Sequence, residues 1–527
     1  MLHYLTLLDI AFLFLGVFCV KRLLRSRGAP LPPGPRPWFG FLAFPSRTDK
    51  EWVTYGKWTE KWGDITSVTA FGQTVVVVNS LKTAMQILDK KSSNYSDRPV
   101  FQMCGELVGW TLGLVLISAR TPQFRWTRKN FHQLIGSQAN VKKFHPLEVE
   151  EYRKFLQRLL ESPEQFRSHI HLTSGAIGLR FTYGYTVQGE NDPIINLVNK
   201  VMEEFSESIT PGAFLVDLLP MCKYPMQYLK YVPSWMPGAG FQIKAKLWSK
   251  HRSEMLDKPF KLVEEQLALG SAESSFVSIL LRQNISKDEV TYLKWAAGSI
   301  YGGATDTTAS AVSTFFLQMT LHPEIQAKAQ AELDAVVGNC RLPGYDDREC
   351  LPYIDALVKE VFRFHPIAPM GKSLDSPVFI HIVLFLSSVG LPHRAAEDDI
   401  HNGYLIPKGS LVLANIWNMA HDPEVYADPL AFNPSRFIAS DEHTPEPDPR
   451  DFIFGFGRRV CPGKLIADAS VFIACAMTLA TFTISKAVKN GKTIQPVEDY
   501  QSGTISSPAP FVCSIKPRSA EAVALIL

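Results

Sequence analysis

Apolar and polar residues follow one another along most of the chain in patterns that predict helices, and one short region predicts strands. The strand region is residues 64–79, where two runs rich in threonine and valine flank a turn near Gly72. The longest helix is predicted to begin after Ser286, because Glu289 three residues later completes a capping box. Nothing interrupts this helix before Pro323, and about 35 residues at 1.5 Å each span roughly 50 Å, enough to cross a whole domain.

Shorter segments with helical character surround this long helix. Residues 81–90 are predicted to be helical, as are residues 323–337, which begin with a proline and end before Gly338. A further helix is expected to end before Pro366, because proline cannot continue it. A last, strongly apolar helix is predicted to begin at Pro462, since proline suits the first helical position.

The N-terminal 37 residues differ from the rest of the chain. Residues 1–20 are almost continuously apolar, and four basic residues follow within positions 21–27. About 20 apolar residues span a bilayer, and basic residues after such a run disfavour a cleaved signal peptide. By the positive-inside rule they keep the following chain in the cytosol. We therefore predict a transmembrane anchor at 1–20, a basic and proline-rich linker at 21–37, and a single large domain at 38–527.

The overall composition excludes several classes of function. With 46% hydrophobic residues the chain can bury a sizeable core, and no linker rich in glycine, serine or charge divides it. A net charge of +3 gives no reason to expect nucleic acid as a partner. Eight cysteines show no paired spacing, so we expect no disulfide framework and a reducing compartment.

One cysteine has an unusual setting, in the segment FGFGRRVCPG at residues 454–463. Cys461 lies between a glycine-rich turn and a predicted helix start, where free N–H groups and the helix dipole lower a thiol's pKa. Gly455, Gly457 and Gly463 allow the backbone to approach a flat ligand closely. A single cysteine is more often a small buried apolar residue. The spacing F-x-x-G-x-R-x-C-x-G is too specific for that interpretation.

These residues resemble the haem-binding loop of the cytochrome P-450 family, whose cysteine thiolate is an axial ligand of the haem iron. The resemblance implies haem b as cofactor, Cys461 as the iron ligand, and Phe454, Gly455 and Gly463 as part of the cofactor-binding loop. It also implies the cytochrome P-450 fold: mainly α with a small β-rich N-terminal region, in a single large domain after the anchor. The resemblance runs from about residue 32 to residue 518.

A second family motif lies in the middle of the long predicted helix. Residues 303–308, GATDTT, resemble the segment (A/G)-G-x-(D/E)-T-(T/S). Gly302 and Gly303 each destabilise a helix by about 1 kcal/mol relative to alanine, which a helix passing over a flat cofactor would explain. The resemblance implies that Asp306 and Thr307 relay protons to bound oxygen and are the catalytic pair.

Two further motifs indicate a structural role. Glu360 and Arg363 fit the family's ExxR motif and share one helix face. Arg436 lies in FNPSRF and fits the PxRF element. The resemblance implies that the three side chains form a structural lock behind the haem loop and take no part in the chemistry.

Four basic residues are candidates for binding the haem propionates through the same resemblance. Arg128 fits the arginine of the family's W-x-x-x-R motif, while Phe124 occupies the tryptophan position and has no N–H to donate. His393 and Arg459 are the other principal candidates, and Arg98 is a further one.

Residues 372–390 do not fit the family pattern. Their apolar stretch, 378–389, is too short to span a membrane, and an exposed loop this apolar favours aggregation. One hypothesis is a loop that dips into the membrane. The other is a retained intron, because codons for the residues at both ends permit splice-donor and splice-acceptor sequences. Removing the corresponding 57 nucleotides would restore the sequence M-G-L-P-H-R.

The resemblance, closest to fungal microsomal members, predicts a membrane-anchored haem-thiolate monooxygenase. It would hydroxylate or epoxidise a small, largely apolar substrate, in secondary metabolism or xenobiotic oxidation. NADPH-cytochrome P-450 reductase is the implied electron donor, with cytochrome b5 as a second candidate. The endoplasmic reticulum membrane is the expected location, with the aromatic segment 224–241 contacting lipid. Two alternatives are a haem-thiolate isomerase or dehydratase, which intact Asp306 and Thr307 disfavour, and a non-functional chain disabled by residues 372–390.

Overall fold

The structure, a computed structural model, describes residues 29–35, 50–70, 73–189, 191–210, 213–218, 239–370, 391–441, 443–501 and 505–527, with the isolated residues 233 and 236. The predicted anchor, the segment 372–390 and most of the aromatic segment 224–241 lie outside these residues.

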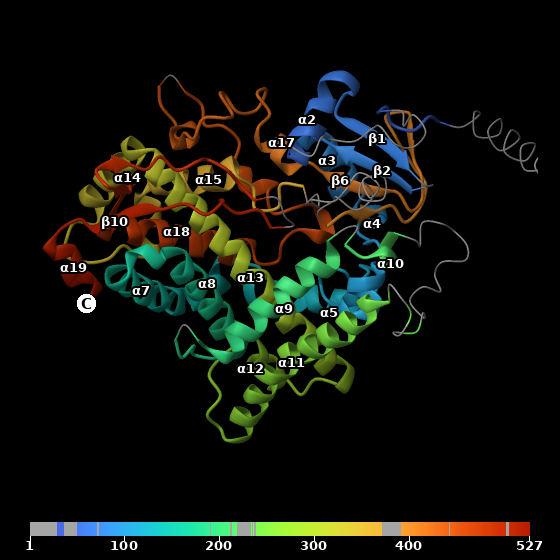
Figure 1. Cartoon of the computed structure of the whole chain (residues 1–527), viewed down its shortest axis with the longest axis horizontal. Helices are drawn as coiled ribbons and strands as arrows, with labels where there is room; N and C mark the ends of the chain where they lie inside the picture. The colour runs from blue at the N-terminus through green and yellow to red at the C-terminus, as the bar shows by residue number, and fades with distance from the viewer. Residues whose placement is uncertain are drawn as a thin grey trace, which may run out of the picture.

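Helices make up most of the structure and surround one long central helix (Figure 1). This helix, α13 (Lys287–Leu321), packs against α8 (Phe166–Tyr183) and α18 (Lys464–Thr481). Its predicted capping box is present, because Ser286 Oγ accepts a hydrogen bond from Glu289 N and Glu289 Oε2 accepts one from Ser286 N at 2.9 Å. The other helices in the described ranges are α2 (Glu51–Trp62), α3 (Leu81–Ala84), α4 (Ser92–Tyr95), α5 (Pro122–Ile135), α6 (Gln138–Val141), α7 (His145–Glu161), α9 (Pro193–Ile209), α10 (Leu215–Leu218), α11 (Gly240–Ala268), α12 (Phe276–Leu281), α14 (Pro323–Val336), α15 (Pro352–Phe364), α17 (Ile416–Ala420) and α19 (Ala520–Ile526).

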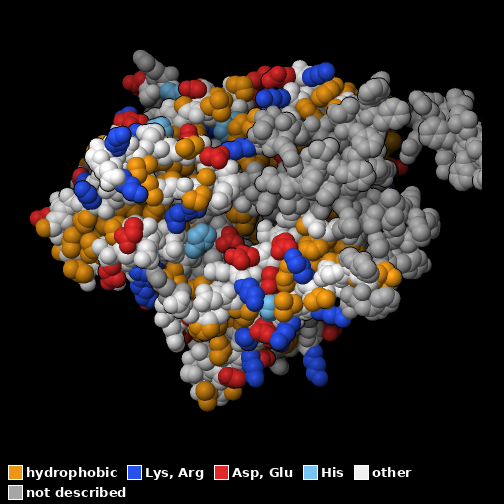
Figure 2. All heavy atoms as spheres, in the orientation of Figure 1, with side chains coloured by type: hydrophobic (Ala, Val, Ile, Leu, Met, Phe, Trp, Pro, Cys, Tyr) orange, Lys and Arg blue, Asp and Glu red, His pale blue; other side chains and the backbone are white. Residues whose placement is uncertain are grey.

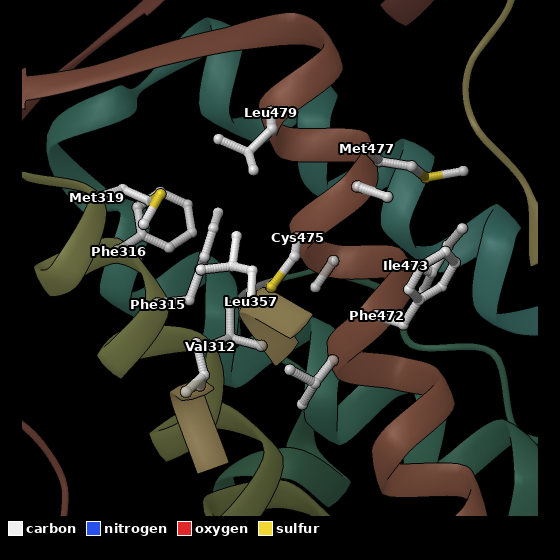
Figure 3. Packing of buried hydrophobic residues seen from close by; sticks show 14 of the residues in the cluster. Val312, Phe315, Phe316, Met319, Leu357, Phe472, Ile473, Cys475, Met477 and Leu479 are labelled. Carbon is white, nitrogen blue, oxygen red and sulfur yellow. The ribbon is translucent and has the colours of Figure 1, made fainter. Parts of the chain in front are cut away.

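The largest apolar core lies where α13 and α18 meet. Phe316 and Met319 of α13 lie near Cys475 and Leu479 of α18, and all four are fully buried (Figure 3). Residue numbers rise in the same direction along both helices in this view, so their N-terminal parts extend toward the same end of the core. Helix α18 is long and apolar enough to span a membrane, but 72% of that stretch is buried inside the protein, as expected for a core helix.

A four-stranded sheet lies beside α2 (Figure 1). Strands β1 (Ile65–Ala70) and β2 (Gln73–Val78) form the predicted antiparallel pair. The sheet continues with β6 (Leu411–Ala414), parallel to β2, and β3 (His393–Arg394), antiparallel to β6. The β-rich region is therefore not confined to the N-terminal part of the chain. The other described strands pair as β4 (Asp399–His401) with β5 (Tyr404–Ile406), β7 (Phe482–Lys486) with β10 (Cys513–Pro517), and β8 (Val488–Lys489) with β9 (Lys492–Thr493).

Most of the helices predicted from local signals are confirmed, with one wrong boundary. Residues 81–90 form α3 followed by a π-helix, η1 (Met85–Lys90), and α15 ends at Phe364, before Pro366. The helix predicted to begin at Pro462 instead begins at Lys464, because Pro462 and the following glycine complete the preceding turn.

Candidate active site

The loop that carries Cys461 is fixed by its own backbone and by η1. Cys461 N donates a hydrogen bond to Phe454 O at 2.8 Å, which closes the loop on itself. Gly455 and Gly457 have φ angles of +84° and +53°, a region that favours glycine. A Cβ at Gly457 would also lie 2.4 Å from Leu88 O of η1. The small size of Gly457 therefore serves the contact with η1, and not the approach to a flat ligand that the sequence suggested.

The Cys461 side chain lines an internal hollow. The surface of the Cys461 side chain is accessible. Protein nevertheless surrounds the thiol closely, and the resulting desolvation raises the pKa of the thiol. The N–H of Gly463 and the charge of Arg128 oppose this rise. The expected lowering of the thiol pKa by N–H groups at the helix start is therefore present, but burial outweighs it in the protein without a ligand.

The predicted propionate residues lie together near this thiol. The electrostatic partners of Arg128 include Cys461, those of Arg459 include Arg128, and those of Arg98 include Arg459. His393 interacts with Arg98 and Arg459, and its Nδ1 lies 2.6 Å from Tyr95 O. The structure thus brings together four basic side chains that are far apart in the sequence.

Burial makes this cluster electrostatically unfavourable in the absence of an anion. Desolvation lowers the pKa of Arg98 to about 9, with a further contribution from Arg459, and that of Arg459 to about 10. Asp97 is the one acidic side chain among the electrostatic partners described for the three arginines. Arg98 Nε is buried without a hydrogen-bond partner. Such a group of partly buried cations fits a ligand with negative charges, and the two propionates of haem meet this requirement.

Backbone carbonyls already accept several of the hydrogen bonds that this basic cluster can donate. Arg459 donates to the carbonyls of Ser96 at 2.7 Å, Leu114 at 2.9 Å and Ile117, and its guanidinium lies 4.6 Å from the ring centre of Phe124. Phe124 therefore gives Arg459 an aromatic face where the family motif has a tryptophan.

A cavity of about 570 Å³ borders this region, and its lining is strongly basic. The lining residues are Ala119, Arg120, Phe124, Arg125, Arg128 and Arg458.

The two glycines of α13 have different surroundings. A Cβ at Gly302 would lie 2.9 Å from Met202 Sδ of α9, so this glycine accommodates a neighbouring helix. A Cβ at Gly303 would meet nothing within 4 Å. Thr307, one turn later, is partly exposed and donates from Oγ1 to Gly303 O at 2.6 Å. Only Gly303 therefore provides open space, and Thr307 borders the same face of the helix.

Asp306 does not point in the same direction as Thr307. Consecutive residues of an α-helix are about 100° apart, and Asp306 interacts with His171 of α8 and Glu203 of α9. Burial raises the pKa of the Asp306 carboxyl, His171 lowers it, and Glu203 raises it further. No motif in the sequence pointed to His171, which follows another histidine, His169, in a helical segment of mixed polarity.

The directions of α13 and α18 place Cys461 and Thr307 at the same end of the core. Thr307 is five residues before Val312, or about 7 Å along α13, and Lys464 is eight residues before Phe472, or about 12 Å along α18 (Figure 3). Both segments extend beyond the packed apolar residues. Cys461, three residues before α18, and the Gly303–Thr307 turn of α13 therefore lie toward the same end of the core.

The three residues predicted to form a structural lock meet in the protein interior. Arg363 Nε lies 2.7 Å from Glu360 Oε2, and Arg436 Nε lies 3.2 Å from Glu360 Oε1. Arg436 has a second partner that the motifs do not include, Glu446, at 2.7 Å. Asn433 N also donates to Glu360 Oε1, at 2.7 Å. The cluster ties α15 to the segment just before the Cys461 loop.

The structure thus combines a mainly helical fold with a thiol that lies beside a cluster of partly buried basic side chains. A model of the family described as Cytochrome P450 matches residues 30–374 and 384–511. The chain belongs to this family. The interruption of the match, residues 375–383, lies within the atypical segment 372–390.

Fungal proteins are among the similar curated relatives. "Cytochrome P450 monooxygenase 208" of Postia placenta is 49% identical over 97% of this chain and 94% of its own length. "Cytochrome P450 monooxygenase claR" of Ampulloclitocybe clavipes is 42% identical over 97% and 90%. "O-methylsterigmatocystin oxidoreductase" of Aspergillus flavus is 36% identical over 96% and 91%. The chain is accordingly an oxidoreductase, a cytochrome P-450 monooxygenase.

Solved structures agree on the fold. A zebra fish cytochrome P450 with progesterone superposes with a TM-score of 0.68 at 21% identity, and covers 89% of this chain and 100% of its own. A second zebra fish structure, with abiraterone, gives a TM-score of 0.66 at 19% identity, with the same coverage. At this identity the likeness concerns the architecture alone.

Proposed function

We propose that the chain is a membrane-anchored haem-thiolate monooxygenase that inserts one oxygen atom from O₂ into a small, largely apolar organic substrate. The observation that carries this proposal is the position of the Cys461 thiol beside the partly buried Arg98 and Arg128, for which the described residues supply no carboxylate partner. A cysteine thiolate as iron ligand and cations that bind the propionates are what a thiolate-ligated b-type haem requires from a protein.

The residues that would hold haem are those of the basic cluster and the cysteine loop. Cys461 would bind the iron, while Arg128, Arg459, Arg98 and His393 would bind the propionates. Phe454, Gly455 and Gly463 would form part of the loop that contacts the cofactor. Binding of an anion would stabilise the charged arginines and reverse the lowering of their pKa values. Haem loading should therefore stabilise the whole cluster as well as the iron ligand.

A thiolate-ligated haem supplies the reductive activation of O₂ and the transfer of one oxygen atom. The chain positions the other reactants. Gly303 leaves open space over the hollow, and Thr307 presents a hydroxyl group to it. The pKa of Asp306 is raised toward neutral pH, so its carboxyl oxygens can accept and release protons.

The finer assignments follow from the relatives and from the sequence. Fungal relatives named monooxygenases, together with one named for the oxidation of O-methylsterigmatocystin, support oxidation of a small apolar metabolite in secondary metabolism. Residues 1–20 would anchor the protein in the endoplasmic reticulum membrane with the catalytic domain in the cytosol. Members of the family generally use a redox partner, and we assign that role to the membrane-bound NADPH-cytochrome P-450 reductase.

Replacement of the iron ligand tests the proposal. Reduced wild-type protein with carbon monoxide should show the red-shifted Soret band of thiolate ligation. Cys461→Ala should abolish that band, while Cys350→Ala, which changes an exposed cysteine far along the chain, should keep it. A Cys461→Ala protein with an unchanged band would show that another residue binds the iron.

A further inference from the structure

A histidine of α8 lies next to the carboxyl group of α13 that we assign to proton transfer. His171 Nδ1 is 3.8 Å from Asp306 Oδ1, and the two side chains remain 47% and 36% exposed. Helices α8, α9 and α13 converge at the centre of Figure 1. Over this region Figure 2 shows acidic side chains and a histidine at the protein surface. The pair therefore has access to water from outside the protein.

The charges around the pair come from each helix that faces it. Arg167, one turn before His171 on α8, lowers the pKa of the histidine, whereas Asp306 raises it. Glu203 of α9 raises the pKa of Asp306. Tyr301 of α13 is a further electrostatic partner of Asp306. His171 and Asp306 therefore have one neighbouring cation, Arg167, and one neighbouring anion, Glu203.

An ordinary surface ion pair does not account for this arrangement. Such a pair stabilises a protein by about 0–1 kcal/mol, and it raises the pKa of its base and lowers that of its acid. Here desolvation has the larger effect on both partners, so that the pKa of His171 is lowered and that of Asp306 is raised. The two values approach each other, and proton transfer is easiest between groups of similar pKa.

We propose that His171 is a positioning residue for oxygen activation, which receives protons from water at the protein surface and passes them to Asp306. The inference rests on the proposed function, because it requires Asp306 to supply protons. In the step itself the imidazolium of His171 loses its Nδ1 proton to Asp306 Oδ1. This leaves a neutral imidazole and a protonated carboxyl group, and no electrons move. The imidazole then takes a new proton from water, and the protonated Asp306 is the form that supplies a proton in the proposed function.

Histidine is suited to this step and a fixed cation is not. Its charge changes near neutral pH, so it can lose and regain a proton in each catalytic cycle, whereas arginine stays charged. The distance of 3.8 Å is slightly too long for a hydrogen bond, and a rotation of either exposed side chain would shorten it. The pair can thus alternate between contact with water and contact with each other.

The test measures the fate of consumed oxygen in haem-loaded, full-length protein with reductase and NADPH, with 7-ethoxycoumarin as probe. In His171→Gln the fraction of oxygen released as hydrogen peroxide should rise about tenfold, and the dependence of this fraction on pH should disappear. In Arg167→Gln the pH profile of peroxide release should move to higher pH than in wild type, because a positive charge that lowers the His171 pKa is removed. Ser168→Ala, an exposed change on the same helix, should behave as wild type.

A spectroscopic titration gives a readout that is independent of turnover. In protein with ¹³C-labelled histidine, the resonance lost in His171→Gln identifies this residue. Asp306→Asn should lower its pKa, because the favourable carboxylate is removed. If Asp306→Asn raises peroxide release but His171→Gln changes neither release nor its pH profile, the inference is wrong and the proposed function stands. If Asp306→Asn also leaves peroxide release unchanged, the proton-transfer role proposed for Asp306 is wrong.

Discussion

Replacing Glu360 by alanine should remove folded, haem-loaded protein and not merely slow turnover. Glu360 and Arg363 are fully buried, and Glu360 is the one carboxylate in the described chain that pairs with Arg363. Arg436 would keep Glu446 as a partner at 2.7 Å. Arg363 would keep hydrogen bonds to backbone carbonyls, such as that of Ala420 at 2.8 Å, but its charge would be uncompensated.

The expected loss follows from that single buried charge. Removing one partner of a buried ion pair destabilises a protein by about 3–5 kcal/mol. An unfolding entropy of about 2.1 cal/mol/K per residue gives about 1 kcal/mol/K for roughly 500 residues, so the melting temperature should fall by about 4 °C. Glu446→Ala should have a smaller effect, because Arg436 keeps Glu360 at 3.2 Å. Glu349→Ala, an exposed control, should have none.

The assay compares circular-dichroism melting with the amount of carbon monoxide complex per unit of purified protein. The loss of haem-loaded protein should follow the loss of thermal stability across Glu360→Ala, Glu446→Ala and Glu349→Ala. An alanine variant at 360 that melts within 1 °C of wild type and loads as much haem would refute the reasoning. So would a larger effect of Glu446→Ala than of Glu360→Ala.

Three further predictions concern other parts of the chain. Thr307→Ala should release more peroxide per NADPH while Thr307→Ser keeps wild-type coupling, and equal coupling in both would remove the hydroxyl from the mechanism. Burial raises the pKa of Glu148 to about 7 from 4.5, so the folded state loses about 3 kcal/mol of stability as pH rises through this interval. Glu148→Gln should therefore remove this part of the pH dependence of melting, and an unchanged pH dependence would contradict the assignment. Deleting residues 372–390 should raise haem occupancy if they are a translated intron, and equal occupancy would favour a genuine loop.

Features that depend on neighbours in the sequence were predicted well. The capping box at Ser286 begins α13 because both of its hydrogen bonds join residues three apart. Pro323 begins α14, and Gly338 follows its end with a φ of +72°. The spacing of Glu360 and Arg363 places them on one face of α15, where they form an ion pair. In each case a short-range rule decides the structure.

Features that depend on distant contacts were not predicted. The sequence could not show that Gly302 makes room for Met202, because a glycine pair looks the same whether it faces a helix or a cavity. Strand β6 joins the N-terminal β2 across more than 300 residues, which no local pattern indicates. The raised pKa of Cys461 depends on burial by many segments. Local motifs predicted the candidate site residues, whereas packing decides the surroundings of each side chain.

The contacts divide the site into a fixed side and an adjustable side. On the fixed side the cysteine loop is held by Gly457 against η1, and Arg459 by three backbone carbonyls. On the adjustable side Asp306 and His171 are partly exposed and 3.8 Å apart. Ligation of a metal requires rigid geometry, whereas repeated proton transfer requires side chains that rotate. Substitutions around Glu360 should therefore alter haem retention at constant coupling, and substitutions around His171 should alter coupling at constant haem retention.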